Sequence, residues 1–240
     1  MNNTIAINHG KTRMIAHRGV SGLERENTCS AFVAACNRSY YGIETDVHRT
    51  LDGEFVCIHD SETGRVGVDQ LTVEKTTFDT LRSLVLTDMD GKRGRTDLRI
   101  PTMVEYVRLC KRYGKTGILE LKGSYTVQDL AEMVSLIRRE EYLDGITFIA
   151  FDLSNLLNLR SLLPKQPCQF LTTGFSDETL KILMEYRLDL DAEYRAVTRE
   201  CIDKCHENGI QVNAWTVDSV PAADRLVSWN VDYITSNILE

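Results

Sequence analysis

Short apolar segments alternate with amphipathic segments along most of the chain. Segments such as ILEL, ITFIAF, CQFL and VNAW are apolar at nearly every position. Parallel strands that are buried on both faces have this pattern, so we interpret these segments as strands of a parallel sheet. Eight strands are predicted, at 14–17, 42–59 (which includes a hairpin return), 117–122, 146–151, 169–172, 188–193, 211–217 and 232–235.

Helices are predicted between the strands. Apolar residues recur there at spacings of three and four, as at Cys29, Phe32, Val33 and Cys36. Thr102 and Glu105 have the spacing of a capping box, which marks the start of a helix. The predicted helices are 28–36 with Asn27-Thr28 as N-cap, 102–113 ending at Gly114, 126–137, 154–163, 176–186, 198–208 and 219–229.

Eight strand–helix units in 240 residues predict a (β/α)₈ TIM barrel, a fold of typically about 250 residues. A doubly wound sheet is the alternative. The barrel is favoured because polar residues stand at the carboxyl ends of several predicted strands, where barrel active sites lie. These residues are His17, Glu44, Asp46, Glu120, Lys122 and, just past one strand, Asp152.

Residues 61–100 interrupt this alternation. Glycine, aspartate, arginine and threonine are frequent there, and one short helix is predicted around Phe78–Leu84. The run Asp88–Arg99 is predicted to be a mobile loop. We interpret 61–100 as an insertion within a single domain, 1–240, that forms a cap over the mouth of the barrel.

The stretch 42–60 carries candidate metal ligands. Glu44 and Asp46 are two positions apart, so both side chains lie on one face of a strand. The Asp52-Gly53 pair predicts a tight turn, which brings His59 back opposite Asp46. Adjacent carboxylates repel unless a cation lies between them, which favours a metal site. A solvated edge strand with ordinary surface charges is the alternative.

Glu120 and Lys122 repeat this spacing on a later strand, with both side chains expected at the barrel mouth. Glu120 by itself could pair with Lys122. Beside Glu44 and Asp46, however, it provides a third carboxylate. Three carboxylates without a histidine or cysteine ligand favour a hard cation, Mg²⁺, Ca²⁺ or Mn²⁺, over zinc.

Two histidines, His17 and His59, are expected at the same rim. Imidazoles on either side of a phosphodiester can act as base and acid, because their pKa lies near neutral pH. A buried structural histidine is the alternative for each. Arg18 would suit a phosphate oxygen, or form a salt bridge within its loop. His48 stays unassigned, and a surface histidine of the hairpin is the favoured interpretation.

The composition narrows the possible partners. The net charge of −7 argues against nucleic-acid binding and against stable association with an anionic membrane. No apolar run approaches the ~18 residues of a membrane span. The seven cysteines contain no CxxC pair and fall mostly on apolar stripes, which predicts buried free thiols in a reducing compartment. The start, MNNTIAINHGKTR, has no apolar core of a signal peptide, so we expect a cytoplasmic protein.

Several short motifs together resemble the pattern of the glycerophosphodiester phosphodiesterases over residues 14–236. In chain order they are His17-Arg18-Gly19, Glu26-Asn27-Thr28, Glu44-x-Asp46-Val47, Thr50-x-Asp52-Gly53, His59-Asp60, Ile100-Pro101-Thr102 with Glu105, Glu120-x-Lys122, Phe151-Asp152 and Val212–Val217. The chain departs from the family pattern at three places. Arg25 replaces the usual proline, the WTVN motif ends in Asp218, and Thr235-Ser236-Asn237 stands where the family usually has Thr-Asp.

The resemblance implies a (β/α)₈ barrel with a small insertion after the His-Asp pair. It implies a divalent metal held by Glu44, Asp46 and Glu120, with His17 and His59 as the acid–base pair. It further implies that Arg18 and Lys122 contact the phosphate and that Trp215 lines the pocket.

The implied activity is metal-dependent hydrolysis of a glycerophosphodiester to glycerol phosphate and an alcohol, through a cyclic phosphate. Mg²⁺ or Ca²⁺ is the expected cofactor, with Mn²⁺ as a further candidate. One alternative is a related barrel phospholipase that acts on lysophospholipids or stops at the cyclic phosphate. An alternative of another class is a non-catalytic barrel that binds phosphorylated ligands.

Overall fold

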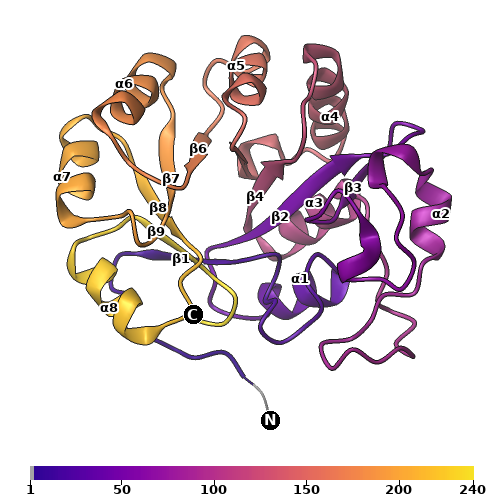
Figure 1. Cartoon of the computed structure of the whole chain (residues 1–240). Coiled ribbons are helices and arrows are strands. Elements are labelled where there is room, and N and C mark those ends of the chain that lie inside the picture. The colour runs from indigo at the N-terminus through magenta and orange to yellow at the C-terminus, as the bar shows by residue number, and fades with distance from the viewer. Residues whose placement is uncertain (1–2) are drawn as a thin grey trace.

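A closed barrel of parallel strands forms the centre of the protein (Figure 1), whose computed structural model describes residues 3–240. Of the nine strands described, eight are parallel, and β1 pairs with both β2 and β9, which closes the sheet. The predicted (β/α)₈ barrel is therefore confirmed, and the doubly wound alternative is excluded. The strands are β1 (Arg13–Ala16), β2 (Gly42–Arg49), β3 (Phe55–Cys57), β4 (Thr116–Leu121), β5 (Ile146–Ala150), β6 (Cys168–Thr172), β7 (Asp189–Glu193), β8 (Val212–Trp215) and β9 (Tyr233–Ser236).

The strand β3 is the predicted hairpin return. It pairs antiparallel with β2, with Val47 opposite Cys57 and Arg49 opposite Phe55. Gly53 in the turn has φ +91, a conformation that glycine adopts without steric cost. The hairpin carries the chain from β2 back toward the carboxyl end of the barrel, where His59 follows.

Helices surround the strands, and their bounds lie within a residue or two of those predicted. The predicted capping box of Thr102 and Glu105 is present, and Gly114 ends that helix in the left-handed conformation. Asp152 caps a helix by accepting a hydrogen bond from the Ser154 amide, and it does not line the central cavity. The helices are α1 (Cys29–Cys36), α2 (Phe78–Ser83), α3 (Met103–Tyr113), α4 (Val127–Arg139), α5 (Leu153–Leu162), α6 (Asp177–Tyr186), α7 (Arg199–Glu207) and α8 (Val220–Ser228).

Alternating side chains of the strands divide the core into two parts. Outward-facing residues such as Leu119 and Leu121 pack in the main hydrophobic cluster, against the helices. A smaller cluster, which includes Ile15, Ile118 and Ile149, comes from alternate strand positions and fills the barrel interior. This apolar layer lies beneath the polar carboxyl ends of the strands, so it would form the floor of a site at that end of the barrel.

Apolar side chains of the inserted segment 61–100 form a small hydrophobic cluster with Val56 of β3. Leu81 of α2 and Leu98 are fully buried in it, together with Ile58 of the hairpin. The predicted short helix is α2, and the run Asp88–Arg99 contains no helix or strand. The role of this segment as a cap stays a prediction.

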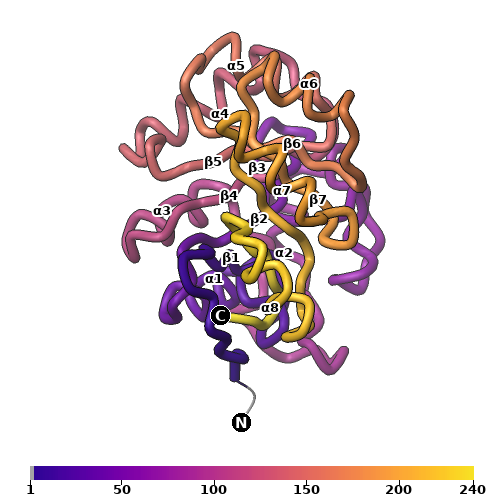
Figure 2. Tube along the Cα trace, turned by 90° about the vertical axis from the view of Figure 1, so that its left-hand side faces the viewer, coloured from indigo at the N-terminus to yellow at the C-terminus, as the bar shows by residue number. Residues whose placement is uncertain are grey.

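The first and last described segments lie side by side at one end of the molecule (Figure 2). The Ile5 amide donates to the Ile238 carbonyl at 2.9 Å, and the Glu240 amide donates to the Ile5 carbonyl at 2.9 Å. These hydrogen bonds pair the segment that follows β9 with the segment that precedes β1. Asn237, one of the departures from the family pattern, belongs to this segment.

The seven cysteines are free thiols, as predicted. Six of them are buried, and Cys29 is half-buried. Within residues 3–240, no helix combines the length and the apolar character needed to cross a membrane.

Candidate active site

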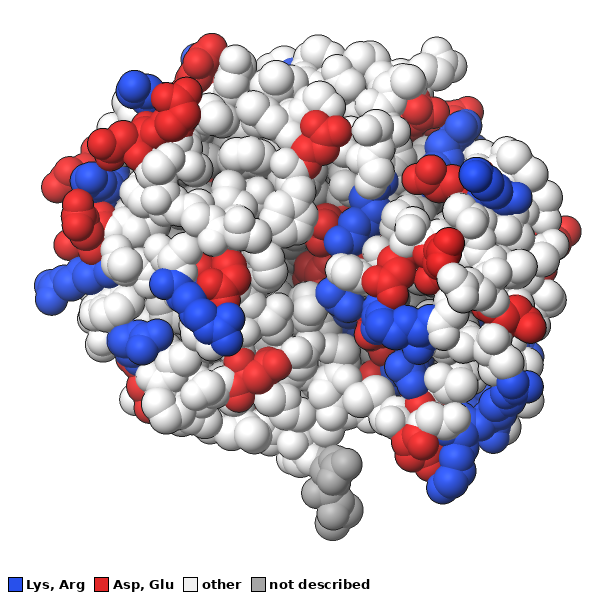
Figure 3. Space-filling view, in the orientation of Figure 1, with Lys and Arg blue, Asp and Glu red and all other residues white. Residues whose placement is uncertain are grey.

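A cavity of about 220 Å³ opens at the carboxyl end of the barrel strands. Figure 3 shows a hollow at the centre of this face, with acidic and basic side chains close together in it. Aromatic and aliphatic side chains, among them Ile149, Phe151 and Trp215, form one part of the wall. The charged and imidazole side chains predicted for the site form the other part: His17, Arg18, Glu44, His59, Glu120 and Lys122.

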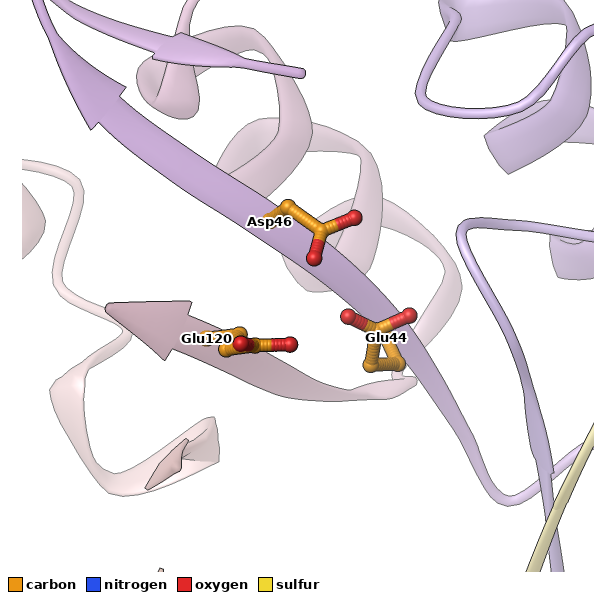
Figure 4. Close-up of side chains that lie close together, drawn as sticks. All are labelled: Glu44, Asp46 and Glu120. Carbon is orange, nitrogen blue, oxygen red and sulfur yellow. The ribbon is translucent and has the colours of Figure 1, made fainter. Parts of the chain in front are cut away.

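Three carboxylates converge beside this cavity (Figure 4). Glu44 and Asp46 come from β2, and Glu120 comes from β4, where it lies directly opposite Asp46 in the strand register. Each residue offers one oxygen, and these oxygens lie within 4.8 Å of one another. The cluster predicted from the spacing in the sequence is therefore present in the fold.

The cluster has a donor set suited to a hard cation. Lys122 Nζ lies 2.7 Å from a Glu120 oxygen and 3.1 Å from Asp46 Oδ1, and Arg18 Nε lies 3.3 Å from Asp46 Oδ2. Two cationic side chains thus face three buried carboxylates. Glu44 Oε1 is buried and has no hydrogen-bond partner among the described residues. A divalent cation would give this oxygen a partner and would neutralise the excess negative charge.

The three carboxyl groups differ in their proton affinity. Burial, together with the nearby Asp46 and Glu120 carboxylates, raises the pKa of Glu44 well above its usual range. Burial likewise raises the pKa of Glu120 to about 7. Burial also acts to raise the pKa of Asp46, but Lys122 and Arg18 outweigh it and bring that pKa below its usual value. Because ligands must lose their protons, a cation would bind more tightly as the pH rises.

Asn27 holds one of the carboxylates in place. Its side-chain amide donates to Asp46 Oδ2 at 2.8 Å, while its own oxygen accepts from the Thr45 hydroxyl at 2.7 Å. The prediction that Asn27 shares the N-cap of α1 was wrong, because Thr28 caps that helix through the Ala31 amide. Asn27 is instead free to point at the strand, where it orients a ligand candidate.

The two predicted histidines both line the cavity. His17 Nε2 lies 3.9 Å from Glu44 Oε2, and His59 Nδ1 lies 2.6 Å from Asp60 Oδ1. Burial, reinforced by Arg18, lowers the pKa of His17 to about 4. Burial also lowers the pKa of His59, although the Asp46 charge opposes this shift. The His17 imidazole is therefore neutral near pH 7 in the protein without a bound cation.

His48 is buried, so the interpretation as a surface histidine was wrong. Its Nε2 lies 3.2 Å from the His59 carbonyl oxygen, and its Nδ1 lies 3.8 Å from a Glu74 oxygen. Glu74 belongs to a short helical turn of the inserted segment, which covers this part of β2. Local spacing in the hairpin could not indicate this cover, and His48 supports the loop that carries His59.

Arg65 is a site-supporting residue that the sequence analysis missed. It belongs to the inserted segment and donates to Glu26 at 2.6 and 2.9 Å and to Asp60 Oδ2 at 2.5 Å. Glu26 in turn accepts from Arg18 at 2.9 Å. Arg65 thus links Asp60, the partner of His59, to Glu26, the partner of Arg18. These hydrogen bonds also connect the insertion to the rim of the cavity.

Asp191 was also missed. It lines the cavity from β7, and its Oδ1 is buried without a hydrogen-bond partner in the described part of the chain. Trp215 packs edge-on against Phe151 with ring centres 5.6 Å apart, and its indole donates to the Asp191 carbonyl at 3.2 Å. The alternation of Asp189, Asp191 and Glu193 is the same i, i+2 signal that indicated Glu44 and Asp46.

Residues 17–239 match the sequence profile of the Glycerophosphoryl diester phosphodiesterase family. This chain belongs to that family. A glycerophosphodiester phosphodiesterase of Caldanaerobacter subterraneus is 26% identical over 230 residues, which cover 95% of this chain and 94% of the relative. Another, from Bacillus altitudinis, is 26% identical and covers 93% of each chain. The fold is similar to that of an Oleispira antarctica phosphodiesterase, with a TM-score of 0.86, 21% identity, and coverage of 98% of this chain and 96% of that one.

The predicted family and the prediction that the chain is an enzyme of this family are confirmed. The alternative of a non-catalytic binding barrel is not favoured. The roles of the individual site residues stay predictions, which variants can test.

We expect Glu44→Gln, Asp46→Asn and Glu120→Gln each to weaken Mg²⁺ or Ca²⁺ binding, because each removes one anionic oxygen donor. The loss should be at least about tenfold, since the loss of even an outer-shell partner commonly costs about 10–100-fold. Isothermal titration calorimetry measures the affinity. Glu193→Gln, a half-buried carboxylate at the end of β7 outside the cluster, is the matched control. Unchanged affinity in all three ligand variants would contradict the assignment.

Proposed function

We propose that this protein hydrolyses glycerophosphodiesters to glycerol phosphate and an alcohol, using one divalent cation held by Glu44, Asp46 and Glu120. Mg²⁺ or Ca²⁺ is the favoured cation, with Mn²⁺ as a further candidate. The observation that carries this proposal is a cluster of three carboxylates, two of which line one cavity together with both histidines, in a chain of this family.

The size and the walls of the cavity support a small phosphorylated substrate. About 220 Å³ suits a glycerol phosphate unit, with a charged wall for the phosphate and an aromatic wall for the glycerol carbons. The Oleispira antarctica phosphodiesterase was crystallised with the product sn-glycerol-3-phosphate, which supports the same substrate class here. Free thiols support the reducing cytoplasm as the location, and a role in glycerophospholipid breakdown follows from the substrate.

The chain supplies its own positive charge beside the carboxylates. A bound divalent cation would polarise a phosphoryl oxygen and lower the pKa of a neighbouring hydroxyl. Arg18 and Lys122 line the same cavity, so we assign them to the remaining phosphoryl oxygens, where charge develops in the transition state. Trp215 would contact the apolar carbons of the glycerol.

The two histidines have different partners, which supports different roles. His59 faces the Asp60 carboxylate, which stabilises a protonated imidazole. His59 is therefore suited to donate a proton to the leaving alkoxide. His17 faces an uncharged amide and is unprotonated near pH 7, so it is available to accept the proton of the attacking hydroxyl.

The nucleophile of the first step is the 2-hydroxyl of the substrate in this proposal. A tethered hydroxyl has a large effective molarity compared with free water. Its attack on phosphorus forms a five-membered cyclic phosphate and expels the alcohol. Water then opens the ring, with the two histidines exchanging roles.

Activity on a substrate panel tests the proposed reaction. We expect release of glycerol phosphate from glycerophosphocholine and glycerophosphoethanolamine, loss of this activity with EDTA, and its return with Mg²⁺ or Ca²⁺. A lysophospholipid in the panel tests the phospholipase alternative. Hydrolysis of the lysophospholipid alone, or full activity in EDTA, would contradict the proposal.

A substrate with the 2-hydroxyl replaced by hydrogen tests the nucleophile. It should be cleaved at least about 10²-fold more slowly, the lower end of a general acid–base contribution. Phosphorus NMR of the natural reaction should also detect the cyclic phosphate. Equal turnover of the deoxy and natural substrates would show that water is the nucleophile.

Shortening the inserted segment tests its role as a cap. Met89 lines a second cavity that also contacts His17 and Arg18, so we expect removal of residues 89–94 to change headgroup preference. Leu98, Arg95 and Asp88 are kept, because Leu98 is buried and the other two are bonded to residues outside the insertion. The ratio of kcat/KM between glycerophosphocholine and glycerophosphoethanolamine is the readout. A lower melting temperature with an unchanged ratio would show a purely structural segment.

A further inference from the structure

The ring of His17 is held from the side opposite the carboxylates. Its Nδ1 lies 2.7 Å from Asn237 Oδ1, and the Ser21 hydroxyl donates to the same oxygen at 2.5 Å. Asn237 directly follows β9, in the segment that pairs with Ile5. The contact therefore joins the end of the first strand to the end of the last one, across the barrel seam.

Asp218, in the loop that follows β8, holds Asn237 in turn. Asn237 Nδ2 donates to Asp218 Oδ2 at 2.6 Å, and the Asn237 backbone amide donates to Asp218 Oδ1 at 2.8 Å. The Ser236 hydroxyl also donates to Oδ1, at 3.0 Å. Three donors thus fix the Asp218 carboxylate, although it lies at the surface.

These contacts determine which way the Asn237 amide faces. A carboxylate only accepts hydrogen bonds, so the amide must present its NH₂ to Asp218. Its oxygen then faces His17, where the Ser21 hydroxyl also donates to it. An oxygen only accepts, so His17 Nδ1 must carry the proton. In a neutral imidazole Nε2 is then the unprotonated nitrogen.

We propose that Asp218 and Asn237 are positioning residues, which hold His17 as the tautomer with its proton on Nδ1 and leave Nε2 free to accept the proton of the substrate hydroxyl. This inference rests on the proposed function, because it assigns a state to the proposed base. Asp218 and Asn237 are two of the places where the sequence departs from the family pattern, and in the fold they bind each other.

The variant Asp218→Asn tests whether Asp218 sets the tautomer of His17 or only stabilises the surrounding loops. Its Oδ1 would still accept from the Asn237 backbone amide and the Ser236 hydroxyl, which prevents a flip of the new side chain. Its new NH₂ would face the NH₂ of Asn237, and two donors cannot bond. Asn237 would then turn its amide and present NH₂ to His17 Nδ1, which moves the ring proton to Nε2.

We expect kcat of Asp218→Asn on glycerophosphocholine to fall by about 10²-fold, the lower end of what a general base contributes. KM should change much less than kcat, because Asp218 does not line the cavity assigned to the glycerol phosphate unit and lines only the second cavity, beside Met89. The exchange variant D218N/N237D should recover most of the lost kcat. In it, the new amide at position 218 donates to the new carboxylate at position 237, whose other oxygen accepts the proton of His17 Nδ1.

Asp232→Asn is the matched control. Asp232 accepts from His206 Nε2 at 2.8 Å and from the Val212 amide at 2.8 Å, so it is also a carboxylate partner of a histidine. It lies outside the catalytic cavity, next to His206 in a separate one. Its substitution should leave kcat unchanged. A loss of kcat in Asp218→Asn that the exchange variant does not recover would overturn the proposal, as would a lower melting temperature with unchanged kcat.

Nitrogen-15 NMR of the imidazole rings tests the tautomer directly, in the wild-type protein and without substrate. The signal of His17, assigned by its loss in His17→Gln, should show the proton on Nδ1 near neutral pH. A proton on Nε2 in the wild type would overturn the inference even if no variant folds. Because this readout needs no turnover, it stays valid if the protein fails to hydrolyse any glycerophosphodiester, an outcome that would contradict only the proposed function.

Discussion

Mutual repulsion among three buried carboxylates is the constraint around which this protein is arranged. Glu44, Asp46 and Glu120 come together at the carboxyl edge of two neighbouring strands. Burial of like charges at such short range is unfavourable unless cations or hydrogen-bond donors compensate it. Arg18, Lys122 and Asn27 each face Asp46, which is why this carboxyl keeps a low pKa while its neighbours take up protons more readily. A divalent cation bound among the three carboxylates would complete the compensation at Glu44.

The backbone makes this unfavourable cluster possible. The register of β2 and β4 places Asp46 beside Glu120, and the period of two in a strand adds Glu44 on the same face. Closure of the barrel brings His17, which directly follows β1, and the segment after β9 to the same rim. The hairpin adds His59, whose carbonyl lies against the buried His48. The residues of the site thus come from segments distant in the sequence, and the hydrogen-bonded sheet fixes their relative positions.

Periodic features were predictable from the sequence, and contacts between distant segments were not. Spacing of two predicted the carboxylate cluster, and alternation of strands and helices predicted the barrel. Asn27 stands just before a helix and was therefore predicted to cap it. Its hydrogen bond to Asp46 joins two segments that no local sequence pattern connects, so it could not be predicted. His48 looked exposed because the covering residue, Glu74, belongs to an insertion without periodicity. Arg65 and the Asp218–Asn237 pair are likewise long-range partners. Only Asp191 had a local signal, the alternation along β7, that was left unused.

We propose that one divalent cation binds among the three carboxylates, beside both histidines. A crystal grown with Mn²⁺ and measured for anomalous scattering tests it most directly. We expect one strong anomalous peak within about 2.6 Å of an oxygen from each of Glu44, Asp46 and Glu120, the upper range for hard cations on carboxylates. Lys122 should move away from at least one of its two carboxylate partners. A saturated crystal with no peak at this position, and with Lys122 still between Glu120 and Asp46, would show that these carboxylates do not hold a cation.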